Sequence, residues 1–234
     1  MPDMRKALLS EWALRSEDFM KTRKDRIMKK TVITIARSYG SGGRTLGKLL
    51  GEKLGINCYD REILRMASDE SGINEALFGQ ADEKLKKSPL LAILKKNPYK
   101  GGVLPPESAD FVSDDNLFNY QAKVIQELAA QESCIIIGRC ADYVLRDDPD
   151  VIRLYFYAPL PDCVTRVMNQ NGLSEKEAVK KIEKTDKYRA DYYRYYTGRD
   201  WNDARNYNFC LDTTSMTYEK LIEVVENFIH IYQK

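Results

Sequence analysis

The stretch TVITIARSYGSGGRTLGKLL (residues 31–50) decides the fold. It reads as a buried β-branched strand at 31–36, a cluster of glycines, and a helix over Arg44–Leu54. This order is typical of a phosphate-binding loop, although the standard pattern G-x-x-x-x-G-K-[ST] is absent. When Gly42 is aligned with the second glycine of the pattern, Gly43 occupies the lysine position. The sequence therefore predicts a phosphate site without its usual lysine.

The predicted donor site depends on backbone amides and nearby cations. Gly40, Gly42 and Gly43 permit turns that other residues resist, and they let successive N–H groups converge on an anion. The following helix directs its positive end at the same anion, and Arg44 with Lys48, one turn apart, adds charge. Arg44 could supply the charge of the missing lysine, with a different geometry. Gly-Ser-Gly-Gly is also ordinary turn chemistry, but the flanking strand and helix favour phosphate binding.

Two hydroxyl groups in the same stretch are candidate magnesium ligands. Either Thr45 or Ser41 could place its hydroxyl near a Mg²⁺ ion that accompanies the phosphates of ATP. The residues expected to hold the donor nucleotide are Gly40, Ser41, Gly42, Gly43, Arg44 and Thr45.

Strands and helices alternate along the rest of the chain. A short strand ends near Tyr59, and Asp60 is the expected N-cap of the next helix. Ser174 and Glu177 form a capping box at the start of a long basic-aromatic helix. Further strands are predicted in SCIIIGRCADYVL, DVIRLYFYAP and NYNFCLDTT, and further helices at 116–131, 161–172 and 217–234. Continuous Val/Ile runs between helices predict a parallel sheet covered on both faces.

Composition excludes several classes of protein. The chain has 234 residues, 43% hydrophobic and 31% charged, with a net charge of +2, so whole-protein charge gives no argument for nucleic acid. No apolar run approaches a membrane span, and the N-terminus lacks the features of a signal peptide. The five cysteines are widely spaced without a C-x-x-C pair, which favours reduced thiols and a cytoplasmic protein. His230 is the only histidine, which excludes a His-based triad.

The sequence predicts one main domain with an appendage. Residues 1–27 read as a charged N-terminal helix for which a packing or oligomer role fits best, so a homodimer is compatible with the sequence. The domain is predicted to occupy 28–234. Within it, 70–115 is an irregular, proline-containing insertion and 181–201 is a basic segment. Phosphoryl transfer requires parts that exclude water, so these two segments are the candidate acceptor clamp and lid.

The ordered motifs resemble the cytidylate kinase-like family. They are ITIARSYGSGGRTLGKLLGEKLG, CYDREIL, IIIGRCADYVL, YFYAPLPDCVTRVM, GLSEKEA and KTDKYRADYYRYYTGRDW. The resemblance runs from about Met28 to the C-terminus, and the family belongs with the P-loop nucleoside monophosphate kinases. It implies an α/β, three-layer P-loop kinase fold with a parallel sheet, a helical acceptor-binding insertion and a lid. It also implies ATP and Mg²⁺ as cofactors.

The resemblance implies an acceptor-binding set. Cytidylate kinases carry Gly-Arg-Asp, and GRC here keeps the arginine as Arg139, which inherits a phosphate contact with the acceptor. Cys140 replaces the aspartate, and Asp142 lies two residues further on. In the acceptor-binding part of the family, an aspartate opens a helix and a basic residue follows about a turn later. Asp60 with Arg61 or Arg65 resembles this pair, and these three residues complete the set.

The lid motif is matched in part. Cytidylate kinases carry Arg-x-x-x-Asp-x-x-Arg there, and Asp186 and Arg189 match the last two positions. Ile182 occupies the first, which leaves Lys181 or Lys184 as substitutes. The candidate catalytic residues are therefore Arg44, Asp186 and Arg189.

Three functions are weighed. The first is Mg-dependent phosphoryl transfer from ATP to a small acceptor, expected to be a pyrimidine nucleoside monophosphate. The second is a nucleotide-binding regulatory module without turnover. It is considered because this chain lacks the loop lysine, one lid arginine and the Gly-Arg-Asp aspartate that cytidylate kinases carry. The third is a single-stranded nucleic-acid binder that uses the arginines and tyrosines of RADYYRYYTGR (189–199). Near-neutral charge and helical tyrosine spacing disfavour the third.

Overall fold

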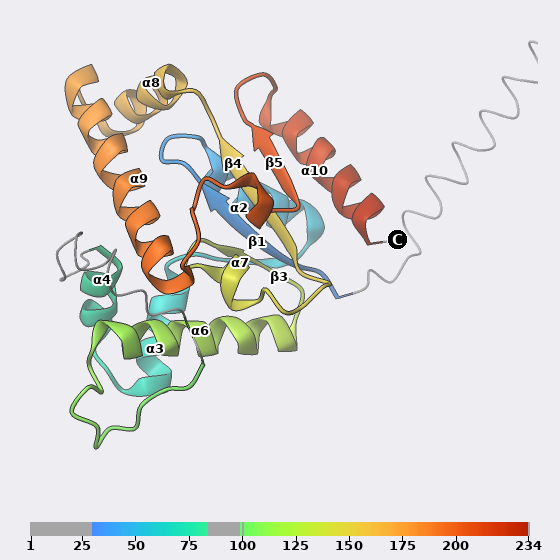
Figure 1. Cartoon of the computed structure of the whole chain (residues 1–234). Helices are drawn as coiled ribbons and strands as arrows, with labels where there is room; N and C mark the ends of the chain where they lie inside the picture. Colours follow the sequence, from blue (N-terminus) through green and yellow to red (C-terminus); the bar gives the residue numbers. More distant parts are fainter. Residues whose placement is uncertain (1–29, 84–98, 100, 234) are drawn as a thin grey trace, which may run out of the picture. The chain divides into compact units, whose positions relative to one another are not determined.

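The computed structural model describes residues 30–83, 99 and 101–233. Its centre is a five-stranded sheet in the order β2-β3-β1-β4-β5 (Figure 1). The strands are β1 (Val32–Arg37), β2 (Asn57–Tyr59), β3 (Cys134–Ile137), β4 (Ile152–Tyr157) and β5 (Phe209–Asp212). Every neighbouring pair runs parallel, which confirms the predicted sheet. The helical appendage predicted for 1–27, and with it the argument for a homodimer, lies outside the described residues.

Helices cover both faces of the sheet, as the continuous apolar strands predict. On one face, Ile33 and Ile35 of β1 pack in a core shared with α2 (Gly43–Leu54) and α10 (Tyr218–Tyr232). On the other face, a larger core joins Val32 of β1 to five helices. These are α3 (Glu62–Ser71), α4 (Glu75–Glu83), α6 (Asp114–Gln131), α7 (Ala141–Val144) and α9 (Glu175–Thr197). The result is the predicted three-layer α/β fold (Figure 1).

The order of the strands gathers several loops at one end of the sheet. β1 lies between β3 and β4, so the loop that follows β1 is adjacent to the ends of both neighbours. The helix α8 (Leu160–Asn171) follows β4, and α9 follows α8. In open parallel sheets ligands bind beyond the carboxyl ends of the strands, where such loops meet.

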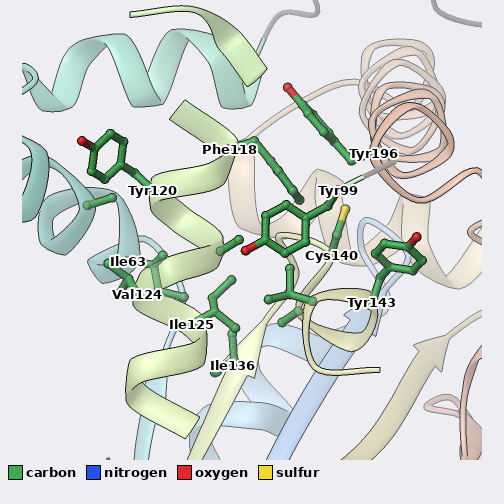
Figure 2. Packing of buried hydrophobic residues seen from close by; sticks show 14 of the residues in the cluster. Ile63, Tyr99, Phe118, Tyr120, Val124, Ile125, Ile136, Cys140, Tyr143 and Tyr196 are labelled. Carbon is green, nitrogen blue, oxygen red and sulfur yellow. The ribbon is translucent and has the colours of Figure 1, made fainter. Parts of the chain in front are cut away.

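Aromatic residues of α9 form part of the larger core. The ring of Tyr196 stacks on Phe118 of α6, with 3.9 Å between ring centroids, and Figure 2 shows Tyr99 and Cys140 beside them. Tyr192 and Tyr193 are also buried. These tyrosines therefore pack α9 against α6 and the sheet. They do not offer their faces to solvent, which counts against the nucleic-acid hypothesis.

Local predictions are confirmed at one helix and wrong at another. The capping box of Ser174 and Glu177 is present at the start of α9. Asp60, however, is not an N-cap: Arg61 holds that position in helical geometry, and α3 begins at Glu62. The carboxylate of Asp60 is instead engaged by arginines from distant parts of the chain. A long-range ion pair has replaced the local cap.

The start of the segment 70–115 is more regular than the sequence predicts, while its residues 84–98 and 100 lie outside the described part of the chain. The start contains α4 (Glu75–Glu83), in which Phe78 is fully buried in the larger core. α4 contacts both α3 and α6, so these three helices pack together beside the sheet. The residues 101–113 that precede α6 have no helix or strand, and Ser113 caps α6 by accepting from the amide of Asn116 at 3.3 Å.

Candidate functional site

The loop between β1 and α2 has the backbone geometry of an anion cradle. Gly40 and Gly42 have φ values of 83° and 80°, a region that favours glycine. Gly42 is also the N-cap of α2. The first amides of a helix have no intrahelical partners, so Arg44 and Thr45 present theirs at the positive end of the helix dipole. We call residues 38–43 the phosphate loop.

The side chain of Ser41 maintains this loop from within. It is fully buried; its hydroxyl donates to the carbonyl oxygen of Ser38 at 2.9 Å and accepts from the amide of Gly43 at 3.2 Å. The hydroxyl is thus committed to the turn. Thr45 is exposed on the first turn of α2. Of the two hydroxyl groups that the sequence suggests as magnesium ligands, the geometry favours that of Thr45.

Arg166 of α8 braces the phosphate loop from behind. Its guanidinium donates to the carbonyl oxygen of Ser41 at 2.6 Å, and to the hydroxyl and carbonyl oxygens of Thr213 at 3.1 and 2.8 Å. Thr213 is buried directly after β5, and its hydroxyl also donates to the Ser41 carbonyl. This arginine therefore joins the phosphate loop to the loop after β5. In the sequence, Arg166 looks like one more charge on the surface of a helix.

Position 43 has no space for a lysine. A Cβ atom on Gly43 would lie 2.8 Å from Cβ of Arg37 and 3.0 Å from Cβ of Phe156. Contacts this short require a shift of the backbone or of the neighbouring strands β1 and β4. The glycine in place of the usual lysine is therefore dictated by packing.

Asp60 is the centre of a cluster of arginines. Its buried carboxylate lies 2.6 Å from Nε of Arg44 and 3.9 Å from Nη2 of Arg37. Its carbonyl oxygen accepts from Nε of Arg139 at 3.0 Å. Residues from the first turn of α2, the end of β1 and the turn after β3 thus meet at one aspartate. The sequence grouped Arg61 and Arg65 with Asp60. Arg61, at the N-cap of α3, and Arg65, within α3, are exposed and do not join the ion pairs of Asp60 within the described part of the chain.

Arg139 is held in an uncommon backbone conformation. Its φ is 56°, and that of Cys140 is 53°, so two successive non-glycine residues adopt left-handed geometry. The side chain is fixed by Asp60 and by Oε1 of Gln121, which accepts from Nη1 at 3.0 Å. Strained backbone of this kind clusters at functional sites, where the surrounding structure compensates for it.

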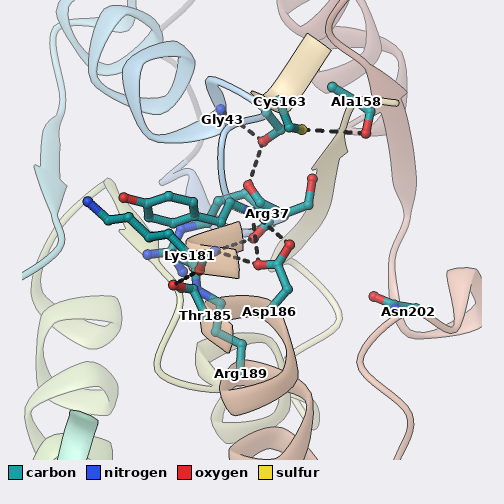
Figure 3. A network of polar contacts seen from close by, with 12 residues as sticks. Arg37, Gly43, Ala158, Cys163, Lys181, Thr185, Asp186, Arg189 and Asn202 are labelled. Carbon is teal, nitrogen blue, oxygen red and sulfur yellow. Dashed lines mark hydrogen bonds and ion pairs between the residues drawn. The ribbon is translucent and has the colours of Figure 1, made fainter. Parts of the chain in front are cut away.

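The helix α9 brings Asp186 and Arg189 to the phosphate loop. Figure 3 shows both beside Arg37 and Lys181. Asp186 accepts from the amide of Tyr39 at 2.8 Å, and Arg189 donates to Asp186 and to the carbonyl oxygen of Arg37, each at 3.1 Å. Burial raises the pKa of Asp186, while the charge of Arg189 opposes that rise. The hydrogen bonds of Asp186 to the Tyr39 amide and of Arg189 to the Arg37 carbonyl connect α9 to the loop.

Lys181 lies on the same side of α9. Its ammonium group donates to Oδ1 of Asn171 at 2.8 Å and lies 5.8 Å from the centre of the Tyr39 ring. Of the two lysines considered as substitutes for the first lid arginine, Lys181 thus lies near the phosphate loop, whereas Lys184 is exposed.

Sequence reasoning missed Arg37. When the second glycine of G-x-x-x-x-G is aligned with Gly42, the first glycine falls at position 37, where this chain has arginine. That departure from the pattern is the sequence signal that could have drawn attention to Arg37. The guanidinium of Arg37 lies beside the carboxylate of Asp60, and its carbonyl oxygen accepts a hydrogen bond from Arg189. Its side chain also packs against Gly43.

Comparison with known proteins identifies the family. The profile of the Cytidylate kinase-like family matches residues 32–215, from β1 to beyond β5. The chain belongs to the cytidylate kinase-like family. The match includes the phosphate loop, the Asp60 cluster, the Gly138–Cys140 turn and α9.

Curated relatives of this cytidylate kinase-like protein match over most of their length. A cytidylate kinase of Methanosarcina barkeri is 25% identical over 196 residues, 83% of this chain and 93% of the relative. One from Methanosarcina mazei is 26% identical over 200 residues, 82% of this chain and 93% of the relative. A crystal structure of an uncharacterized protein from Eubacterium ventriosum has a TM-score of 0.62 at 24% identity and covers 86% of this chain and 99% of its own. Among the described residues, no helix is long and apolar enough to cross a membrane.

Proposed function

We propose that this cytidylate kinase-like protein transfers the γ-phosphoryl group of ATP to a small phosphorylated acceptor, with a pyrimidine nucleoside monophosphate as the expected acceptor. The observation that carries the proposal is the convergence of Arg37, Arg44, Arg139 and Arg189 on the phosphate loop and Asp60. Phosphoryl transfer needs little covalent chemistry from a protein. It needs held phosphates and cations against the charge on the moving group.

The donor would be held by the phosphate loop and α2. Amides after Gly42 point outward at the helix start, where the dipole favours the β- and γ-phosphates of ATP. Magnesium fits this site as an ion carried on the phosphates, with Thr45 as its protein ligand, since Mg²⁺ is commonly bound by one or two protein oxygens plus substrate phosphates. When bound, it neutralises charge on the phosphate oxygens. Ser41 is not assigned as a ligand because its hydroxyl is committed to the loop.

The acceptor would lie between Arg139 and the phosphate loop. Arg139 is positioned by its hydrogen bonds to Asp60 and Gln121, and a guanidinium is well suited to bind an acceptor phosphate. Arg61 and Arg65 stay candidates for a second contact, from the exposed face of α3. A pyrimidine base is proposed because the chain is similar to cytidylate kinases.

The transfer step requires no general base. The acceptor phosphate oxygen forms a bond to the γ-phosphorus as the bond to the bridging oxygen breaks, and the electron pair leaves with ADP. Arg44 and Arg189 would stabilise the charge on the moving group, and Asp186 would hold α9 over the loop through Tyr39. We propose that 181–201 acts as the lid and that 70–115, of which 84–98 and 100 lie outside the described residues, acts as the acceptor clamp, so that closure excludes water.

The test is ADP release from Mg-ATP with a panel of nucleoside monophosphates. Native protein is compared with Arg44→Ala and Arg189→Ala. Arg205→Ala serves as the control because Arg205 is exposed and, among the residues the structure describes, forms its ion pair with its neighbour Asp203. We expect one pyrimidine monophosphate to stimulate turnover. Each site substitution should lower kcat by about 10²-fold or more, the usual cost of removing one charge-stabilising donor, and the control should have no effect.

A regulatory module that binds nucleotide without turnover is the alternative. It is favoured by the glycine at position 43 and by Ile182 at the first lid position. Tight ATP binding with no ADP release for any acceptor in the panel would support this alternative and contradict the kinase proposal. Single-stranded nucleic-acid binding is a weaker candidate because the α9 tyrosines are buried.

A further inference from the structure

Arg37 and Gly43 form a steric pair. The Cβ atom that any other residue would place at position 43 comes within 2.8 Å of Cβ of Arg37. These are the positions that the standard pattern gives to its first glycine and its lysine. This chain has arginine where the pattern has its first glycine, and glycine where the pattern has its lysine. The two departures belong together, because a side chain at position 43 would collide with that of Arg37.

The side chain of Arg37 extends from the end of β1 towards the turn after β3. A Cβ atom at Gly138, after β3, would lie 3.3 Å from Cζ of Arg37 and closer still to Nη1. Nη2 lies 3.9 Å from the carboxylate of Asp60. The carbonyl oxygen of the same residue accepts from Arg189 of α9. Arg37 thus contacts the phosphate loop and the turn after β3, and Figure 3 shows it beside Asp186 and Arg189 of α9.

Arg37 is also the better shielded of the two cations beside Asp60. Its side chain is 18% exposed, against 53% for Arg44. Charge interactions weaken with exposure to water and salt. A cation that stabilises a transferring phosphoryl group must act where water is excluded. Between the two, Arg37 has the environment that such a cation requires.

We propose that Arg37 is a catalytic residue that replaces the phosphate-loop lysine, and that its guanidinium binds the γ-phosphate of ATP between donor and acceptor. This inference rests on the proposed function, since it assigns a residue to that reaction. It transfers the role of the lysine from the start of α2 to the end of β1. It also explains why a loop with glycine at position 43 can still serve phosphoryl transfer.

The first experiment measures Kd values for Mg-ATP and Mg-ADP by calorimetry, which needs no turnover. In Arg37→Met the aliphatic stem that packs against Gly43 is largely kept while the charge is removed. We expect ATP affinity to fall about tenfold or more with ADP affinity unchanged, and kcat to fall about 10²-fold. Arg205→Met, with a similar loss of charge at a distant exposed site, should change neither constant. Circular dichroism and thermal unfolding verify that each variant is folded.

A second variant moves the charge back to the usual position. Arg37→Gly removes the Cβ atom nearest to a side chain at position 43, and Gly43→Lys added to it restores a lysine there. Phe156, whose Cβ lies 3.0 Å from that position, must then shift by a few tenths of an ångström. The double variant should recover ATP-over-ADP preference relative to Arg37→Gly. The inference is overturned if Arg37→Met keeps the native ATP-over-ADP preference and kcat. If native protein binds neither nucleotide, the proposed function itself is wrong, and the assignment of Arg37 with it.

Discussion

The guanidinium of Arg166 donates to the carbonyl oxygen of Ser41 at 2.6 Å and thereby fixes the peptide between Ser41 and Gly42. In a trans peptide the C=O and N–H bonds point in opposite directions. The amide of Gly42 is therefore directed to the face of the phosphate loop that lies opposite Arg166. Thr213, bound to the same guanidinium, extends this brace to the end of β5.

Arg166→Met should loosen the phosphate loop without removing any group that contacts nucleotide. We expect the Kd for ATP to rise about tenfold, because misplaced amides bind phosphate less well. The free energy of unfolding should fall by about 1.5–3 kcal/mol, the usual effect of losing hydrogen bonds to a charged group. Calorimetry and urea unfolding measure the two effects.

The matched variant is Thr213→Val, which keeps the shape of the side chain and removes only its hydroxyl. It should produce a smaller change of the same kind, because the Thr213 carbonyl still accepts from Arg166. If ATP affinity is native in Arg166→Met, the brace has no role in donor binding.

Asp60→Asn should separate binding from turnover. The substitution removes the negative charge that pairs with Arg44 and Arg37, while the backbone carbonyl that holds Arg139 remains. ATP should bind up to about threefold more tightly, since Arg44 is partly exposed and its ion pair is weak. kcat should fall by about tenfold or more, because both arginines lose their fixed orientation. Steady-state kinetics with the best acceptor measure kcat, and calorimetry measures the Kd for ATP. Weaker ATP binding together with a native kcat would contradict this prediction.

The layers of the fold could be predicted because their signals are local. Ile33 and Ile35 in a continuous apolar run indicate a strand buried on both faces, and the capping box at Ser174 marks the start of α9. The glycines of the phosphate loop carry an equally local signal, since a left-handed φ at Gly40 and Gly42 is what glycine permits.

Residues whose partners are distant in sequence could not be assigned from the sequence alone. Asp60 fits an N-cap by local pattern, but Arg44 lies 2.6 Å away in the fold and takes its carboxylate. Arg166 looks like one more charge on an amphipathic helix until Ser41, 125 residues earlier, is placed beside it. Side chains that join separate loops leave no periodic trace in the sequence.

Arg153→Lys should destabilise the turn after α7. The guanidinium of Arg153 donates to five backbone carbonyl oxygens at 2.9–3.2 Å, which belong to Asp142, Leu145, Arg146, Asp148 and Val151. Helix ends leave carbonyl oxygens unpaired, and an ammonium group with three donors cannot satisfy five of them. We expect the free energy of unfolding to fall by about 1–3 kcal/mol in urea titrations. Arg205→Lys, at an exposed pair, is the control and should match the native protein.

The buried carboxyl of Asp142 in α7 should make stability depend on pH. Tyr193 of α9 donates to its Oδ2 at 2.6 Å. Burial raises the pKa of Asp142 from 3.8 to about 6, although the Tyr193 hydrogen bond and the charges of Arg153 and Arg199 oppose that rise. The folded state therefore binds more protons than the unfolded state between about pH 4 and 6. Stability from this group is present below that window and is lost as pH rises through it.

Asp142→Asn removes this titration while an amide oxygen can still accept from Tyr193. The free energy of unfolding of the native protein, minus that of the variant, should fall between pH 4 and pH 7 by an amount on the order of 3 kcal/mol. Urea unfolding of both proteins at half-unit steps measures the difference, in which the titrations of all other groups cancel. A difference that stays constant, or rises with pH, would show that Asp142 is charged in the folded protein throughout. The carboxylate would then be stabilised by Tyr193 and the nearby arginines more strongly than burial opposes it.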